Sequence, residues 1–510
     1  MTQSQHSGPT RALVIGAGLG GLAAAMRLGA KGYAVTVLDK LDRAGGRGSS
    51  ITKGGHRFDL GPTIVTVPQV YETLWAACGR NFRDDVTLKP LDPFYEIRWP
   101  DGSNFYATGD TKIMETEVAR LNPADVPGYR RFLKDSHRRY VVGFEGLLTK
   151  PMHKLWETIK VLPEFAVLRA DQSILKLAQK RVQDERLRMA LSFHPLFIGG
   201  DPMHVTSMYA LVSYLEKEFG VHYAMGGVQA IADAMVRVIE DQGGTLRLGA
   251  EVDEVVVEKG RAVGVRLVDG EVLSAPVVVS NADATHTYDR LLRHHRVGGW
   301  TRASKTRRLS MSLFVWYFGT AGTQGLWEDV GHHTILSGPR YEGLLRDIFM
   351  KGKLADDMSV YLHRPSLTDP SVAPAGGDTF YALSPVPHLG HGGVDWAEEK
   401  AIYKRKMARV LNDTIPGFQD HLTEEVVFTP ETFRDRYLSP YGAGFSLEPR
   451  ILQSAWFRPH NITRVPGLYL TGAGTHPGAG VPGVVSSAEV LERLIPDAPV
   501  PVEELKVAAE

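Results

Sequence analysis

Short apolar runs and one helical stretch alternate at the start of the chain. Residues 12–15 are continuously apolar, and a run of this length and branching indicates a buried parallel strand. The pattern then predicts a helix over residues 22–31 and a second strand over residues 34–38. A strand, a helix and a strand in this order indicate an α/β fold with a parallel sheet.

The later pattern is more mixed. Residues 95–99 and 104–106 flank Pro100-Asp101-Gly102, which indicates a hairpin. From residue 111 to about residue 181 the pattern is helical and is interrupted by prolines. Two further helices are expected at residues 228–242 and 484–494. Further strands are expected near residues 245–248, 251–258, 262–267, 277–279, 311–318 and 467–471.

Three glycines follow the first strand with the spacing G-x-G-x-x-G, at Gly16, Gly18 and Gly21. In this spacing the first glycine allows a tight turn, the second lets the backbone approach a pyrophosphate, and the third lets the helix pack on the strand. Asp39 ends the second strand, where an acid accepts hydrogen bonds from a ribose. The pattern therefore predicts a dinucleotide site. The neighbouring residues expected to contribute to this site are Ala17, Gly20 and Lys40.

A second glycine motif, Gly45-Gly46-Arg47, follows the acid, and Gly61-Pro62-Thr63 comes shortly afterwards. With the first motif, these residues resemble the amine-oxidase and carotenoid-desaturase branch of the FAD-binding proteins. The resemblance implies that Arg47 reaches the FAD phosphates and that the Gly61-Pro62-Thr63 turn lies near the flavin. This branch usually has glutamate at the ribose position, and Asp39, one methylene shorter, can do the same work.

The last predicted strand ends in Gly472-Ala473-Gly474, and a second glycine-rich loop leads from it to the last predicted helix. The N-terminus of such a helix can point its amides and dipole at the N1/C2 side of a flavin and stabilise the reduced form. The further FAD contacts expected from the resemblance are Val252 near the adenine, Asp283, Gly483 and Val484.

The composition is that of an ordinary soluble protein. The 510 residues include 58 basic and 58 acidic side chains, so the net charge does not suggest nucleic-acid binding. Cys78 is the only cysteine, which excludes an intrachain disulfide and a cysteine metal cluster. The N-terminus lacks the apolar segment of a signal peptide, and the sequence has no apolar run long enough for a transmembrane helix. We therefore expect a cytoplasmic protein.

The most specific match lies in residues 472–483, which read Gly-Ala-Gly-Thr-His-Pro-Gly-Ala-Gly-Val-Pro-Gly. With residues 193–200, 361–365 and 384–388, this segment resembles the bacterial phytoene desaturases, and the likeness extends over residues 11–495. It implies an FAD-dependent enzyme that desaturates phytoene, a C40 carotenoid, to neurosporene or lycopene. One carbon would give a hydride to the flavin and its neighbour would lose a proton. Oxygen or a quinone would be the electron acceptor.

The resemblance and the order of the elements divide the chain into domains. A Rossmann-like FAD-binding domain is expected to be discontinuous, with residues 11–85, 222–283 and 431–495. An inserted mixed sheet-and-helix domain for the substrate and the membrane is expected at residues 86–221 and 284–430. Flexible tails are expected at residues 1–10 and 496–510.

Residues 130–156 are rich in lysine, arginine and histidine, with apolar and aromatic side chains between them. A basic amphipathic stretch of this kind can lie in a membrane surface. The alternative is a solvated helix that packs on the core by its apolar side. A substrate dissolved in lipid, as the resemblance implies, favours an enzyme attached peripherally to a membrane surface.

Catalytic residues are indicated less directly. His476 lies in the loop expected beside the flavin, and its alternative role is loop packing. Glu157 and Lys160 align with a position where relatives carry an acid–base pair, and their alternative role is a surface ion pair. Several histidines invite a metal hypothesis, but no H-E-x-x-H arrangement accompanies them, so no metal site is expected. These histidines are His332, His333, His388 and His391.

Two other classes of function remain open. A later-step carotenoid desaturase of the hydroxyneurosporene type, a carotene isomerase and a ketolase share the FAD loops. Guanine-nucleotide dissociation inhibitors share the fold and bind prenyl chains without FAD, but the intact set of glycines, Asp39 and Arg47 argues against this class. The number of desaturation steps, the acceptor and the oligomeric state stay open.

Overall fold

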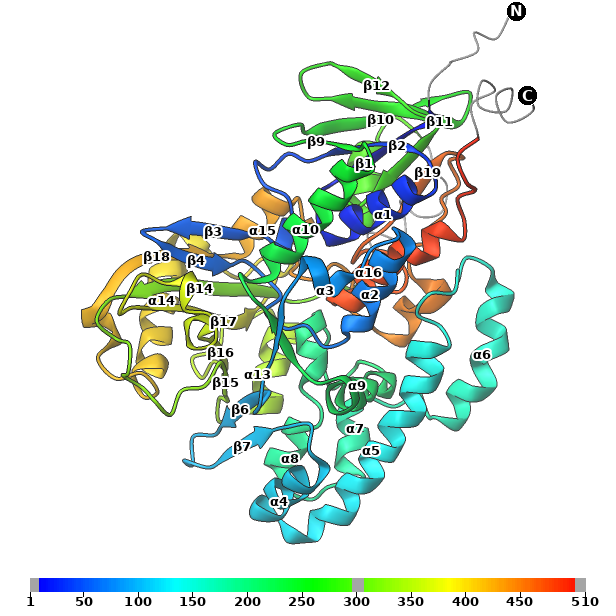
Figure 1. Cartoon of the computed structure of the whole chain (residues 1–510). Helices are drawn as coiled ribbons and strands as arrows, with labels where there is room; N and C mark the ends of the chain where they lie inside the picture. The colour runs from blue at the N-terminus through cyan, green and yellow to red at the C-terminus, as the bar shows by residue number, and fades with distance from the viewer. Residues whose placement is uncertain (1–8, 296–306, 500–510) are drawn as a thin grey trace, which may run out of the picture.

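A parallel five-stranded sheet is built from three separate segments of the chain (Figure 1). The computed structural model describes residues 9–295 and 307–499. The strand order is β19-β13-β1-β2-β9. The strands are β1 Arg11–Ile15, β2 Ala34–Leu38, β9 Thr245–Arg247, β13 Val277–Ser280 and β19 Leu468–Leu470. The predicted α/β fold with a Rossmann-like sheet is confirmed.

Four helices pack together beside this sheet and form one apolar core with it. They are α1 Leu19–Ala30, α2 Pro68–Ala77, α10 Val228–Asp241 and α16 Val481–Glu492. α1 is central, because it contacts each of the other three helices. Its first ten residues are all buried, and their glycine and alanine side chains allow the close approach.

A second, mostly antiparallel sheet has the order β18-β14-β17-β16-β15-β6-β7. Its strands are β6 Tyr95–Arg98, β7 Asn104–Ala107, β14 Ser312–Thr320, β15 His333–Leu336, β16 Val360–His363, β17 Asp378–Val386 and β18 Leu422–Phe428. β6 and β7 form the predicted hairpin. β14 is buried on both faces: one face packs against helix α14 (Trp396–Asn412), and the other belongs to a second apolar cluster that includes Phe58 and Phe433.

The predicted helical region forms a lobe that lies below the parallel sheet and to the right of the large sheet in Figure 1. It contains α4 Thr111–Leu121, α5 Val126–Tyr140, α6 Leu155–Val167, α7 Ile174–Gln179, α8 Glu185–Ala190 and α9 Leu211–Phe219. Asp110 caps α4 by accepting hydrogen bonds from the amides of Lys112 and Ile113. α6 is the outermost helix of the lobe and stands apart from α5.

The remaining elements connect the sheets and the lobe. The strands are β3 Ser50–Lys53, β4 His56–Asp59, β5 Leu88–Pro90, β8 His222–Ala224, β10 Val252–Glu258, β11 Arg261–Leu267 and β12 Val272–Ser274. The helices are α3 Phe82–Asp85, α11 Ala284–His286, α13 Tyr341–Arg346 and α15 Pro430–Tyr437.

Two helices begin earlier than predicted. α1 starts at Leu19 and not at residue 22, because Gly18 is its N-cap and the next two glycines already lie in the first turn. α16 starts at Val481 and not at residue 484, with Gly480 as N-cap. Pro482 fits this first turn because a backbone N–H at this position has no partner inside the helix.

Two of the predicted domain boundaries can be compared with the positions of helices and hydrogen bonds. The boundary after residue 430 cuts α15, and this helix packs against β14 and β18 of the large sheet. The predicted C-terminal tail is held at its start, because the Ala498 amide donates to the Lys31 carbonyl at 2.9 Å and the Tyr33 hydroxyl donates to the Pro496 carbonyl at 3.0 Å. The rest of the predicted tails, residues 1–8 and 500–510, lies outside the described residues.

No helix in the described part of the chain is both long and apolar enough to cross a membrane.

Candidate functional site

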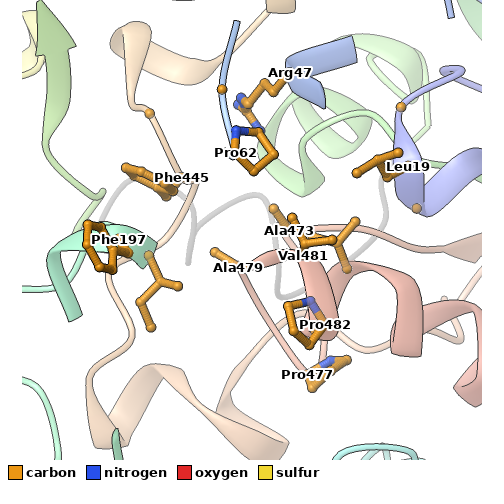
Figure 2. Close-up of a pocket in the computed structure, with 18 of the residues that line it drawn as sticks. Leu19, Arg47, Pro62, Phe197, Phe445, Ala473, Pro477, Ala479, Val481 and Pro482 are labelled. Atoms are coloured by element: carbon orange, nitrogen blue, oxygen red, sulfur yellow. The ribbon is translucent and has the colours of Figure 1, made fainter. Parts of the chain in front are cut away.

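One cavity of about 1110 Å³ connects the glycine edge of the parallel sheet with the helical lobe and the large sheet. Its walls include Gly16 and Arg47 on one side and Leu162 of α6 on the other. In Figure 2, Phe197 and Phe445 face Ala473 and the start of α16 across the open space. This volume lies just above the range of about 300–1,000 Å³ that single small-molecule pockets occupy.

The first glycine turn has the geometry that the spacing predicted. Gly16 adopts a φ of +95°, which favours glycine. A Cβ on Gly21 would lie 1.9 Å from the Gly16 carbonyl oxygen, so only glycine lets α1 pack this closely against the turn. Gly18 is the N-cap of α1 and offers no side-chain acceptor to the helix amides. The N-terminus of α1 therefore presents free N–H groups to the cavity, which suits a phosphate.

Asp39 is buried in the cavity wall, with 9% of its surface exposed. Its carboxylate accepts the Ala17 amide at 2.7 Å and the Leu41 amide at 2.8 Å. Burial raises the pKa of Asp39, although these two amides and Lys40 act in the opposite direction. Because each carboxylate oxygen has a second lone pair, Asp39 holds the turn and can still accept a hydrogen bond from a ribose.

Arg47 lines the cavity next to the glycine turn. It donates to the Ser439 hydroxyl and lies over the Tyr437 ring, 5.9 Å from the ring centre. Its Nε is buried and has no hydrogen-bond partner among the described residues. Burial lowers the pKa of Arg47, and the charge of Asp283 opposes this shift. An arginine with an unused buried donor in a cavity wall suits an anionic ligand.

The Gly61-Pro62-Thr63 turn forms another part of the wall. The Thr63 hydroxyl lies 2.7 Å from the Tyr361 hydroxyl, and the Tyr381 hydroxyl donates to the Gly61 carbonyl at 3.5 Å. These contacts tie the turn to β16 and β17, so the large sheet fixes the position of the turn.

The C-terminal glycine loop and the first turn of α16 close the cavity opposite this turn (Figure 2). Arg458, which is 1% exposed, holds the loop from behind. Its guanidinium donates to the Ala473 carbonyl at 2.7 Å and to the Thr475 carbonyl at 3.0 Å. Gly480 caps α16 without a side-chain acceptor, so a second helix N-terminus presents amides to the cavity.

Most of the sequence-predicted cofactor residues do line the cavity. They are Gly16, Gly18, Gly20, Asp39, Lys40, Gly46, Arg47, Gly61, Pro62, Thr63, Val252, Asp283, Ala473, Gly483 and Val484. Four others are not part of the cavity lining. Three of them are glycines at close contacts of the chain, and the fourth donates its amide hydrogen to Asp39. They are Ala17, Gly21, Gly472 and Gly474.

Asn281 is a cavity residue that the sequence reasoning missed. It follows β13 directly, and its amide donates to the Gly16 carbonyl at 3.3 Å. The same side chain lies 2.9 Å from the Cβ that Gly18 would carry, so it locks the glycine turn against the sheet. A polar residue directly after a parallel strand was the available signal, because ligands of such sheets bind at the carboxyl ends of the strands.

These features fit FAD. The two helix N-termini and Arg47 provide donors for phosphates, and Asp39 provides an acceptor for a ribose. The buried Oδ2 of Asp283 has no partner among the described residues, so it offers a further unused acceptor in the same wall.

His476 is in the cavity wall, as expected for a residue beside the cofactor. It is buried, its Nε2 lies 3.3 Å from the Leu147 carbonyl, and its Nδ1 has no described partner. Burial is the main cause that lowers the pKa of His476 to about 4. The ring is therefore neutral at pH 7, and its free Nδ1 is a weak base.

Glu157 and Lys160 do not reach the cavity. Their side chains are 35% and 46% exposed and form an ion pair of 3.4 Å on the outer side of α6. The residues of α6 that line the cavity are Thr158, Leu162, Phe165 and Ala166. Because residues 157 and 160 lie on another face of the same helix, the structure favours the surface ion pair over the catalytic role.

His332, His333 and His363 come together where β15 begins at His333 and β16 ends at His363, each with a ring nitrogen within 4.8 Å of the others. The Nε2 atoms of His332 and His363 are 3.1 Å apart, so one ring donates to the other. Burial lowers the pKa of His332 to about 3 and lowers the pKa of the other two well below the usual value. Three neutral imidazoles are potential metal ligands, and the expectation of no metal site stays a prediction.

Comparison with known proteins assigns the family. Residues 19–489 match the family model of the flavin containing amine oxidoreductases. The chain is 67% identical over 499 residues to a neurosporene-forming phytoene desaturase of Cereibacter sphaeroides, an alignment that covers 97% of this chain and 96% of the relative. The chain belongs to the bacterial phytoene desaturases. It is an FAD-dependent oxidoreductase of the flavin containing amine oxidoreductase family.

One further relative agrees with this family, and one solved structure agrees with its fold. A lycopene-forming phytoene desaturase of Pseudescherichia vulneris is 42% identical over 488 residues, which cover 95% of this chain and 99% of the relative. The solved structure of an oxidoreductase from Methanosarcina mazei has a TM-score of 0.65 at 18% identity and covers 95% of this chain and 100% of its own. This structural likeness shows the fold alone. The predicted family, fold and FAD cofactor are confirmed.

Proposed function

We propose that this desaturase converts phytoene to neurosporene by three successive desaturations. The observation that carries the proposal is one continuous cavity, which runs from the residues expected to bind FAD to apolar walls in the helical lobe. The choice of neurosporene rests on the relative at 67% identity, which forms neurosporene, whereas the relative at 42% identity forms lycopene.

The protein supplies position and surroundings for this reaction. When bound, FAD supplies the two-electron oxidation by taking a hydride from one of two neighbouring carbons. The polyene is held without hydrogen bonds by Phe197, Phe445 and the leucines of the lobe. A long chain can therefore slide along the cavity between successive reactions. The start of α16 presents its amides to the cavity and favours a negative charge there.

We also propose that the enzyme takes its substrate directly from a membrane surface. α6 exposes several large apolar side chains, of which Trp156 is 58% and Val167 81% exposed. Leu162, Ile451 and Phe457 line the cavity and are at the same time 51%, 38% and 36% exposed. The cavity therefore opens within an apolar patch. Lipids with an apolar interior are the surroundings that such a mouth fits.

The test is an incubation of the purified protein, loaded with FAD, with phytoene in liposomes and with oxygen or a quinone as electron acceptor. Chromatography of the pigments counts the desaturations. A product with three new double bonds supports the proposal, and accumulation of lycopene would contradict the assigned end product. Unchanged phytoene together with turnover of a later carotenoid would move the enzyme to a later step, and isomers or ketones as products would identify a carotene isomerase or ketolase.

A further inference from the structure

A buried polar cluster lies in the otherwise apolar part of the cavity wall. His194 and Glu216 both line the cavity, and they are only 4% and 6% exposed. The Nε2 of His194 is 3.0 Å from Oε2 of Glu216. The hydroxyl of Tyr95 donates to the same carboxylate oxygen at 3.2 Å and is also 3.2 Å from the Nε2 of His194. Buried ionisable groups are costly, so a carboxyl group and an imidazole in an apolar cavity point to a function.

The hydrogen bonds define which nitrogen of His194 is free. Burial and the charge of Glu216 raise the pKa of Tyr95 well above its usual value, so Tyr95 keeps its proton and acts as donor. A carboxylate at Glu216 can only accept, so the Nε2 of His194 carries the hydrogen in their bond, and the Tyr95 hydroxyl donates to the carboxylate and not to this Nε2. Its Nδ1 is therefore an acceptor. This Nδ1 is buried and has no partner among the described residues.

His194 lines the cavity on the same short helix as Phe197, a residue that faces the C-terminal glycine loop. His194 starts the 3₁₀ helix His194–Ile198, and Phe197 lies one turn later, on the same side of that helix. Phe197 faces the C-terminal glycine loop across the cavity in Figure 2. The Phe197 ring also lies 6.2 Å from the ring of Tyr361, whose hydroxyl contacts Thr63 of the predicted flavin turn.

We propose that His194 is the base that accepts the proton lost from the substrate during each desaturation, and that Glu216 positions its ring. This inference rests on the proposed function. The C–H bond of one carbon breaks and its proton goes to Nδ1 of His194, while the electron pair forms the new C=C bond. The neighbouring carbon loses its hydride to the bound flavin, which is reduced. The acceptor, oxygen or a quinone, then reoxidises the flavin.

Glu216 gives His194 an advantage over His476. Both rings line the cavity and both have an unpartnered Nδ1. The Nε2 of His476, however, bonds to a backbone carbonyl, whereas the Nε2 of His194 bonds to a carboxylate. A carboxylate stabilises the imidazolium that forms when Nδ1 takes a proton, and it holds the ring in the tautomer that can take it. His194 is therefore the more favourable proton acceptor of the two histidines.

The test compares His194→Gln and Glu216→Gln with the wild-type protein. Rapid mixing with phytoene under anaerobic conditions measures flavin reduction in a single turnover, at saturating substrate and over a range of pH. Flavin absorbance during titration measures FAD affinity, and binding of the non-reactive end product measures occupation of the cavity. His204→Gln is the matched control, because His204 pairs with Asp201 on the same loop, is exposed and does not line the cavity.

For His194→Gln we expect flavin reduction to slow by about 10²–10⁴-fold, the usual contribution of a general base, with FAD and product affinities within about twofold. Glu216→Gln should slow reduction less and alter its pH profile, since a glutamine allows the wrong tautomer of His194. His204→Gln should match the wild type. Flavin reduction in His194→Gln within about threefold of the wild type would overturn the assignment, as would a loss confined to affinity. Absence of phytoene turnover by the wild type would instead contradict the proposed function.

Discussion

The exposed apolar face of α6 leads to a quantitative prediction for membrane binding. Trp156 is 58% exposed and Ile159 is 49% exposed. A tryptophan side chain buries about 200 Å² at most, so roughly 120 Å² of Trp156 is free to enter lipid. At about 25 cal/mol per Å², complete transfer of this area is worth about 3 kcal/mol. Insertion as far as the headgroup boundary realises about half of it.

The perturbation is Trp156→Ser combined with Ile159→Ser. The first substitution should weaken partitioning by about 1.5 kcal/mol and the second by about 0.5 kcal/mol, since half of an isoleucine is exposed and only part of it enters lipid. The sum of about 2 kcal/mol corresponds to roughly 30-fold weaker partitioning onto vesicles. Sedimentation with liposomes measures this directly. Turnover of phytoene embedded in the same liposomes should fall together with binding, and FAD content should not change.

Val268→Ser is the control for this experiment. Val268 is 65% exposed, but it follows β11 in the small three-stranded sheet, far from α6 along the chain. Its substitution removes an exposed β-branched side chain, as Ile159→Ser does, and should leave partitioning unchanged. The reasoning would be refuted if the α6 double variant bound vesicles within about twofold of the wild type, or if Val268→Ser weakened binding as much.

Three further predictions concern the interior. Gly21→Ala would place a Cβ 1.9 Å from the Gly16 carbonyl oxygen, so the glycine turn must shift. We expect FAD affinity, measured by fluorescence titration, to fall at least 100-fold. The free energy of unfolding should fall by about 1–3 kcal/mol. Burial raises the pKa of Asp59 from 3.8 to about 7, so the native state binds the proton more tightly than the unfolded state. The free energy of unfolding should therefore fall by up to about 4 kcal/mol as the pH rises from 4 to 8. Asp59→Asn should remove this dependence in denaturant titrations at pH 5 and pH 8. We expect His332 and His363 to remain hydrogen-bonded to each other without zinc, and one equivalent of tightly held zinc in elemental analysis would contradict this.

The cofactor half of the site could be predicted because backbone geometry defines it. Gly16, Gly21 and Gly61 are needed where the chain turns or approaches itself closely, and such needs leave a fixed spacing in the sequence. The role of Asp39 could be predicted for the same reason, since it directly follows the strand after the glycines. The exact helix starts were not readable, because Gly18 and Gly480 look like loop residues until their N-cap conformations are known.

Glu157 and Lys160 show where spacing is not enough. Their separation correctly put both on one side of a helix, but it could not say which side of α6 faces the cavity. That orientation depends on how α6 sits against the cavity, which Thr158, Leu162 and Phe165 line, and so on the fold of the whole lobe. A surface pair of this kind contributes only about 0.3–0.5 kcal/mol, too little to orient the helix by itself.

No sequence spacing predicts the proton acceptor that we infer, because residues far apart in the sequence form it. Glu216 lies 22 residues after His194 and 121 residues after Tyr95, on a helix, a 3₁₀ turn and a strand of different parts of the fold. A flavoprotein of this kind binds its cofactor mainly through backbone turns, whereas the chemistry on the substrate depends on side chains that only the tertiary structure brings together. The sequence motif around His194 resembled the family without indicating a role. The role follows only once Glu216 is seen to fix the tautomer of the ring.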